Sequence, residues 1–162
     1  MSTSFSTEEL IKVAIVIEKQ GIAYYDVMAI STWHEAASDL FQHLVAWERQ
    51  HLEIFQNMLA ESGNYKLPEK GSNSHEAYMR ALINNAVFTD ELAASELATH
   101  IDSEDGTLDI AISAEKDSIL FYYNLNEILP LPADPVIRQI LNEEKLHLSQ
   151  LSELRQKMLS LK

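Results

Sequence analysis

Residues 44–55 read LVAWERQHLEIF and place two ionisable side chains on an apolar helix stripe. Apolar residues recur here every three or four positions, which predicts an amphipathic helix; they are Phe41, Leu44, Val45, Leu52, Phe55 and Leu59. Glu48 and His51 fall on the same stripe, so the helix would bury both. Because an unpaired carboxylate or imidazole is costly to bury, the two side chains need a partner in the core.

The chain contains the same pattern twice. EKQGIAYY at 18–25 matches EKDSILFY at 115–122, and ERQH at 48–51 matches EKLH at 144–147. Glu18 and Glu48 are 30 positions apart in the first half of the chain, and Glu115 and Glu144 are 29 positions apart in the second. Two helical hairpins with the same polar insertions predict a bundle with a pseudo-two-fold axis.

Four long helical patterns predict an all-α fold, a four-helix bundle. Capping boxes predict the starts of the first two helices, Ser6 with Glu9 and Thr32 with Glu35. The third is expected to start after Ser103, and the fourth after Asp134 as its N-cap.

The long helices pair into two hairpins, because the first and second, and the third and fourth, are joined by short loops. We expect hairpins at about 7–62 and 104–160, within a single domain of residues 1–162. The crossover between helices two and three, at about 63–103, begins with a turn-rich loop and carries one or two short helices.

Composition excludes several classes of function. The formal net charge of −13 disfavours nucleic acid and anionic membranes as partners. The absence of cysteine excludes disulfides, thiolate catalysis and Cys-bound metal centres. The N-terminus shows no signal-peptide pattern, and the apolar run at 13–17 is too short to cross a bilayer, so a cytoplasmic location is expected.

Six polar residues on the apolar stripes form a candidate site for two metal ions. A Glu and a His at positions i and i+3 are neighbours on one helix face and can converge on one ion. Two such pairs and two single glutamates carry four negative charges, which two divalent cations would cancel. The predicted ligands are Glu18, Glu48, His51, Glu115, Glu144 and His147. The alternative is that these buried groups satisfy one another and nearby tyrosines without metal.

This ligand pattern resembles that of the ferritin-like di-iron or di-manganese carboxylate bundles. The run EK-x-x-I-x-F/Y-Y after a core Glu is similar to the rubrerythrin branch in particular. The resemblance implies a ferritin-like bundle, the same six ligands and two iron ions per chain, with manganese as an alternative and zinc as an adventitious occupant. Two-domain rubrerythrins end in a rubredoxin domain with Cys-bound iron, which a chain without cysteine lacks. Ser118 stands where the family carries an extra Glu ligand.

Tyr25 and Tyr122 each follow a ligand Glu by seven positions and therefore lie on the same face. They could donate hydrogen bonds to ligand carboxylates or to a bound oxygen species, as residues around the catalytic centre. Ordinary aromatic packing in the core is the alternative.

Three functions are compatible with these residues. The first is an oxidoreductase that acts on hydrogen peroxide or dioxygen and receives electrons from an external redox protein. The second is a ferroxidase or iron-handling protein that uses the same site, and the third is a bundle used only for protein interaction. The half-bundle symmetry and the family resemblance also suggest a homodimer.

Overall fold

The computed structural model describes residues 5–64, 73–88, 90–99, 103–129 and 133–161. These residues form six α-helices and one 3-10 turn, with no strand among them: α1 Thr7–Ser31, α2 Glu35–Ala60, η1 Ser62–Asn64, α3 Asn73–Asn84, α4 Glu91–Thr99, α5 Glu104–Ile128 and α6 Ala133–Ser160. The predicted all-α bundle is confirmed.

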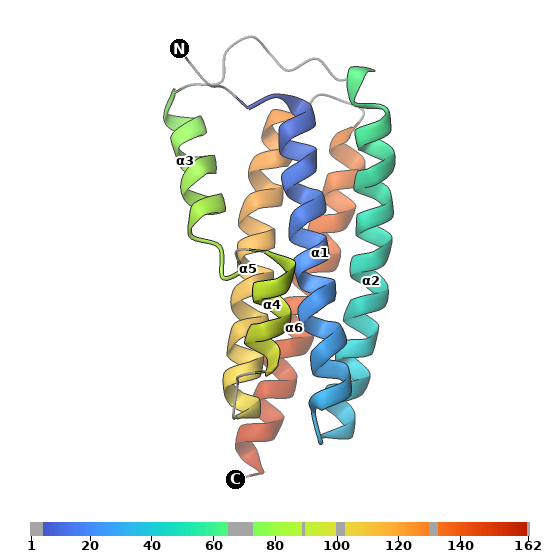
Figure 1. Ribbon diagram of the computed structural model, residues 1–162, viewed down its shortest axis with the longest axis vertical. Helices are drawn as coiled ribbons and strands as arrows, with labels where there is room; N and C mark the ends of the chain where they lie inside the picture. The colour runs from blue at the N-terminus through green and yellow to red at the C-terminus, as the bar shows by residue number, and fades with distance from the viewer. Residues whose placement is uncertain (1–4, 65–72, 89, 100–102, 130–132, 162) are drawn as a thin grey trace.

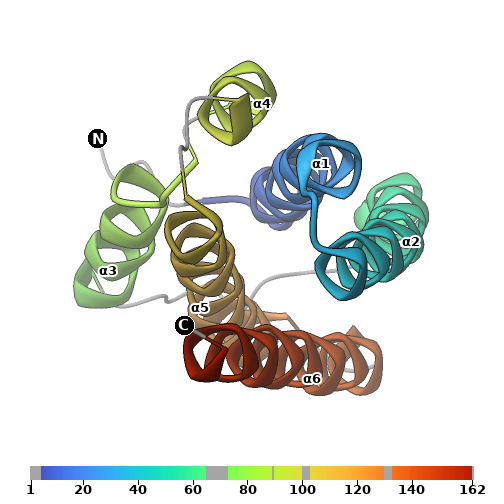
Figure 2. The same ribbon diagram turned by 90° about the horizontal axis from the view of Figure 1, so that it is seen from below.

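The four long helices α1, α2, α5 and α6 run side by side along the length of the molecule (Figure 1). Helix α1 packs chiefly on α2, and α5 on α6, as two antiparallel hairpins. Seen along the bundle, the short helices α3 and α4 lie outside it, next to α5 and α1 (Figure 2). The backbones of α1 and α5 approach each other at few points, and these two helices meet mainly through long side chains.

The helix starts agree with the sequence in some places and not in others. Ser6 and Glu9 form the predicted capping box of α1, and Ser103 caps α5 by accepting the N–H of Gly106. The predicted cap of the second helix is wrong: α2 begins after His34, which makes no side-chain cap. Thr32 instead ends α1 through its backbone N–H, and its hydroxyl accepts the N–H of His34.

The start of the last helix also differs from the prediction. Helix α6 begins at Ala133, so Asp134 is a helical residue and not the N-cap. The proline at 135 fits inside the first turn because N–H groups there have no helical partner in any case.

The apolar core consists of two clusters, and the six polar residues lie between them. One cluster contains Tyr25, Phe41 and Leu108, and the other contains Phe55, Phe121 and Ile140. Along each long helix, the predicted ligands fall between the residues of one cluster and those of the other. Within the described parts of the chain, no helix has the length and apolar character to cross a membrane.

Candidate metal centre

The structure brings all six predicted ligands together in the middle of the bundle. Glu18 comes from α1, Glu115 from α5, and the two Glu-x-x-His pairs from α2 and α6. Each of the six residues is 4% exposed or less. Helical spacing explains this burial, since each ligand occupies a core-facing position of an otherwise apolar stripe.

The six side chains divide into two overlapping groups. Glu18, Glu48, His51 and Glu144 form one, which we call position A, and Glu48, Glu115, Glu144 and His147 form the other, position B. In each group, one ligand atom per residue lies within 4.8 Å of all the others. Glu48 and Glu144 belong to both groups, so the two positions share a pair of carboxylates.

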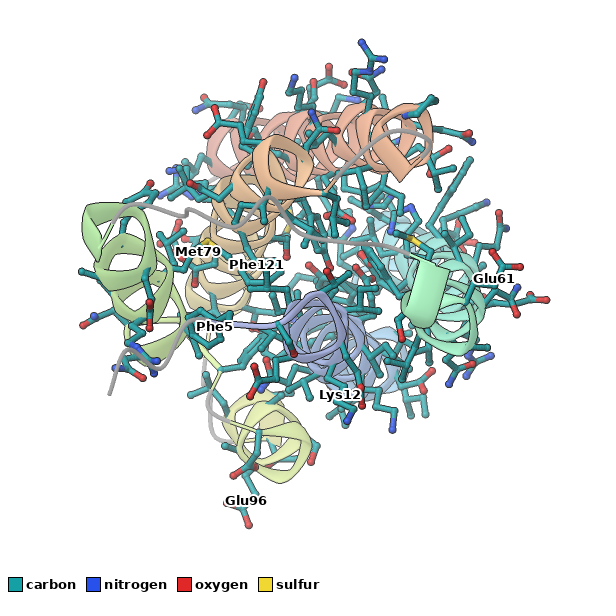
Figure 3. The ribbon with its side chains drawn as sticks, turned by 90° about the horizontal axis from the view of Figure 1, so that it is seen from above. Phe5, Lys12, Glu61, Met79, Glu96 and Phe121 are labelled. Carbon is teal, nitrogen blue, oxygen red and sulfur yellow. The ribbon has the colours of Figure 1, made fainter. Side chains whose placement is uncertain are left out.

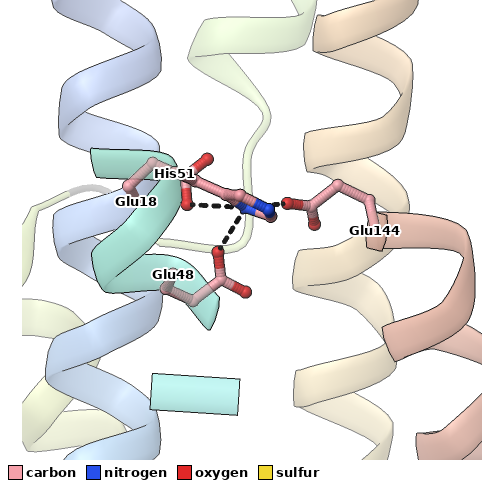
Figure 4. Close-up of side chains that lie close together, drawn as sticks. All are labelled: Glu18, Glu48, His51 and Glu144. Carbon is pink, nitrogen blue, oxygen red and sulfur yellow. Dashed lines mark ion pairs between the residues drawn. The ribbon is translucent and has the colours of Figure 1, made fainter. Parts of the chain in front are cut away.

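The two oxygens of each shared carboxylate face different histidines. At position A, the Nδ1 atom of His51 lies 3.3 Å from Glu48 Oε2 and 2.9 Å from Glu144 Oε1. Figure 4 shows these glutamates and Glu18 around His51. At position B, the Nδ1 atom of His147 lies 3.5 Å from Glu48 Oε1 and 3.9 Å from Glu144 Oε2. A carboxylate placed in this way can bridge two ions.

Two tyrosines connect the halves of the bundle through the unshared glutamates. The hydroxyl of Tyr25 on α1 donates to Glu115 Oε1 of α5 at 2.5 Å, and that of Tyr122 on α5 donates to Glu18 of α1. Burial, followed by the charge of the partner carboxylate, raises the pKa of both tyrosines, so both remain donors. The hydrogen bonds that the sequence suggested for Tyr25 and Tyr122 are therefore present, to Glu115 and Glu18.

The two histidines differ in their neighbours. The Nε2 atom of His51 lies 2.7 Å from Glu143 Oε2, and Gln139 donates to the other oxygen of Glu143 at 3.0 Å. His147 instead lies beside the indole of Trp47, with ring centroids 6.0 Å apart. Glu143 and Trp47 each precede a shared Glu, so they occupy equivalent positions of the repeat. The histidine of position A therefore has a carboxylate at its outer nitrogen, and the histidine of position B has a neighbouring aromatic ring instead.

Several buried polar atoms of the centre form no hydrogen bond among the described residues: Glu18 Oε2, Glu115 Oε2, Glu144 Oε1, His51 Nδ1 and both ring nitrogens of His147. Although His51 Nδ1 and Glu144 Oε1 lie 2.9 Å apart, they are not aligned as a hydrogen bond. Such atoms are rare in protein interiors because each loses its hydration without compensation. Carboxylate oxygens and imidazole nitrogens are also the donors that iron, manganese and zinc accept. The residues therefore fit a pair of metal ions.

Without metal, the carboxylates compete for protons. Burial, and then the charge of Glu48, raises the pKa of Glu18 well above its usual range; burial with the charges of Glu48 and Glu115 does the same for Glu144. Burial also acts to raise the pKa of Glu48, but contacts with Glu18 and the two histidines lower it below the ordinary value. In the metal-free centre, Glu18 and Glu144 therefore hold protons more tightly than a free glutamate does.

Both histidines are more basic in the metal-free protein than in solution. Burial lowers the pKa of each, but the surrounding carboxylates outweigh it. Glu144, Glu18 and Glu48 raise the pKa of His51 far above its ordinary value. Glu115 and Glu48 raise that of His147 to about 9. A metal ion at either position must therefore displace a proton from imidazole.

Sequence reasoning missed Glu143. Its position on α6 is half-buried rather than on the apolar stripe, and its contact with His51 joins residues 92 positions apart. The only sequence clue was the tandem of two glutamates at 143 and 144. Ser118 does not replace the extra Glu of the family, because its hydroxyl donates to the carbonyl of Ala114 on its own helix.

Comparisons with known proteins agree with this centre. The family model described as Rubrerythrin matches residues 9–155 of the chain. Among curated proteins, none matches. A crystal structure of a ferritin-like diiron-carboxylate protein from Thermotoga maritima is similar, with 25% sequence identity and a TM-score of 0.70 over 98% of this chain and 99% of that one.

Proposed function

The chain belongs to the rubrerythrin family, and from that membership we propose that it is a di-iron oxidoreductase that acts on hydrogen peroxide or dioxygen. The observation that carries the proposal is the sharing of Glu48 and Glu144 between two adjacent ligand groups. Single-metal sites do not need such sharing. Manganese could occupy the same donors, and zinc is expected only as an adventitious occupant.

Each residue of the centre has a defined part in this proposal. The four glutamates and two histidines hold the ions, and the four carboxylate charges offset those of two divalent cations. Two ferrous ions, when bound, supply the electrons that reduce peroxide or dioxygen. Tyr25 and Tyr122 hold Glu115 and Glu18 in place and keep hydroxyl donors at the edge of the centre. The two apolar clusters cover the centre along the bundle on either side.

Electrons must return from outside, because the chain contains no cysteine for a second iron centre. We therefore include an external redox protein as the electron donor. The net charge of −13 favours a donor with a basic surface. A homodimer is also part of the proposal, supported by exposed apolar side chains on α5 and α6: Leu120, Tyr123 and Leu146.

A bundle used only for protein interaction is difficult to reconcile with the centre. Four carboxylates that are each 4% exposed or less, several with unpartnered oxygens, destabilise a fold in the absence of metal. Apolar replacements would serve a scaffold better. The arrangement is therefore best explained by ligation.

The test begins with metal content per chain, measured by plasma mass spectrometry on protein purified without added metal. We expect about two ions per chain for the unaltered protein and fewer for Glu144→Ala. Glu153→Ala, an exposed change on the same helix, is the matched control and should retain both. Ferrous protein prepared without oxygen should then be oxidised rapidly by peroxide or dioxygen.

The outcomes separate the alternatives. Oxidation followed by accumulation of iron in a large assembly would favour the ferroxidase or storage function. Failure to bind iron or manganese at all would refute the proposal and support the interaction bundle. Sedimentation velocity on the same samples tests the homodimer.

A further inference from the structure

A cavity of about 250 Å³ opens on the α1–α5 side of the metal centre. Its wall comes from α1, α5, the end of α3 and the segment that follows α3. At its deep end lie Glu18, Glu48 and Glu115, whereas neither histidine nor Glu144 lines it. The cavity therefore reaches the centre from the face opposite the histidines.

The rest of the wall is mostly apolar and includes Val13, Val16, Ile17, Leu82, Phe88 and Phe121. Met79 on α3 packs with Phe121 of α5 behind this wall, and Lys12 lies on the outer side of α1 (Figure 3). Lys12 is half-exposed and pairs with Glu8 at 2.5 Å, so its charge is directed along the surface of α1. Lys12 and Val16, which is 45% exposed, mark the mouth of the cavity.

Two small residues at equivalent positions of the repeat leave this space open. Gly21 follows Glu18 by three positions, as Ser118 follows Glu115, and both line the cavity. A Cβ at Gly21 would lie 3.7 Å from Glu48 Cγ, which is ordinary contact, so crowding does not require glycine there. Larger side chains at these two positions would fill the approach to the carboxylates.

The cavity wall is held in place by a specific contact. The carboxylate of Asp117 on α5 accepts the N–H of Val87 at 2.8 Å. This bond fixes the segment that carries Phe88, whose ring lies 5.0 Å from that of Tyr24 on α1. The cavity is thus bounded by packed elements on both sides of the α1–α5 interface.

We propose that this cavity binds an uncharged, mainly hydrocarbon molecule of about six to ten carbons beside the metal centre. The size follows from volume, since an apolar cavity of about 150 Å³ accepts benzene. The lack of charge follows from the wall, because it is mostly apolar and an ionic group buried against it would lose its hydration without compensation. This inference deepens the proposed function by adding a ligand class at the same centre, but binding in the cavity does not depend on redox chemistry.

The test is calorimetric titration of the full chain, as purified, with toluene and with benzoate, which share a ring and differ in charge. We expect toluene to bind at one site per chain with a dissociation constant of about 1 mM or tighter, and benzoate at least tenfold more weakly. Val16→Phe at the mouth and Ala114→Leu in the wall should each weaken toluene binding at least tenfold. Val136→Phe, the same change at a side chain 37% exposed on α6, is the control and should leave toluene binding unchanged.

Val16→Phe tests the proposal even if Ala114→Leu fails to fold, because Val16 is 45% exposed. No toluene binding, equal binding of benzoate, or toluene binding unchanged by Val16→Phe would overturn the inference. Metal content separates this result from the proposed function. A chain that binds toluene but no metal refutes only the proposed function, and a di-iron chain that ignores toluene refutes only the cavity inference.

Discussion

Replacing Glu143 by glutamine should weaken metal binding at position A and leave position B nearly unchanged. His51 can ligate through Nδ1 only if its proton is on Nε2, and Glu143 Oε2, 2.7 Å from that nitrogen, accepts this proton. Carboxylates behind a ligating histidine fix its tautomer and make it more basic; their loss typically lowers metal affinity by about 10–100-fold. That factor corresponds to about 1.4–2.8 kcal/mol.

Glutamine is a demanding test because it keeps the size of the side chain. Gln139 already donates to Oε1 of Glu143 at 3.0 Å. The new amide can offer only one oxygen, so either His51 or Gln139 would face its NH₂ group. At best, a neutral acceptor replaces a charged one, and hydrogen bonds to charged groups are roughly twice as strong.

The assay is an anaerobic cobalt titration of metal-free protein, followed by absorbance, with Glu143→Gln, the unaltered chain and the exposed control Glu153→Gln. We expect two binding steps, of which one shifts by 10–100-fold in Glu143→Gln. Adding Glu115→Ala, which removes a ligand of position B, should then weaken both steps. Equal weakening of the two steps by Glu143→Gln alone, or no shift of either, would refute the reasoning.

Three further predictions follow from the centre. Glu48→Ala should reduce metal retention at both positions after dialysis, whereas Glu115→Ala should reduce it at one; equal losses would contradict the sharing of Glu48. Tyr25→Phe removes the 2.5 Å bond to Glu115 and should lower the free energy of unfolding in urea by about 1–3 kcal/mol; an unchanged midpoint would contradict the bond. Metal-free protein should lose stability as pH rises from about 6.5 through 9, because the pKa of His147 is raised to about 9 and the folded state holds a proton that the unfolded state releases. That contribution is of order 3 kcal/mol, and denaturation curves at several pH values that show no such fall would contradict it.

The ligand groups could be predicted from sequence because their spacing is local. Glu48 and His51 are three positions apart on one helix, so their shared face follows from helix geometry alone. The repeat then indicated which other helices carry matching groups. The tyrosines were more difficult: the sequence placed Tyr25 on the ligand face but not opposite Glu115, because that contact depends on how α1 lies against α5.

Contacts that depend on how two helices are aligned along their length could not be predicted from the sequence. Glu143 reaches His51 only because α2 and α6 are aligned so that residues 92 apart meet. The cap of α2 was misplaced for a different reason. Thr32 followed by Glu35 has the sequence of a capping box, but the hydroxyl of Thr32 accepts the N–H of His34 instead, within the turn between helices.

The two histidines have different neighbours, and this difference can give two nearly equivalent positions different affinities for metal. The repeat makes the six ligands alike in both halves, yet it places a carboxylate behind His51 and an indole beside His147. An imidazole that donates to a carboxylate is the stronger electron donor to a metal and favours its higher charge state. The neighbour of His147 confers no such effect, because an indole offers only a donor N–H to the ring. The two ligand groups of this pseudo-symmetric bundle therefore differ by one residue in each half, at the position just before the shared glutamate. Exchanging these residues, with Trp47→Glu and Glu143→Trp, should transfer the gain in metal affinity from position A to position B, as measured by the same cobalt titration.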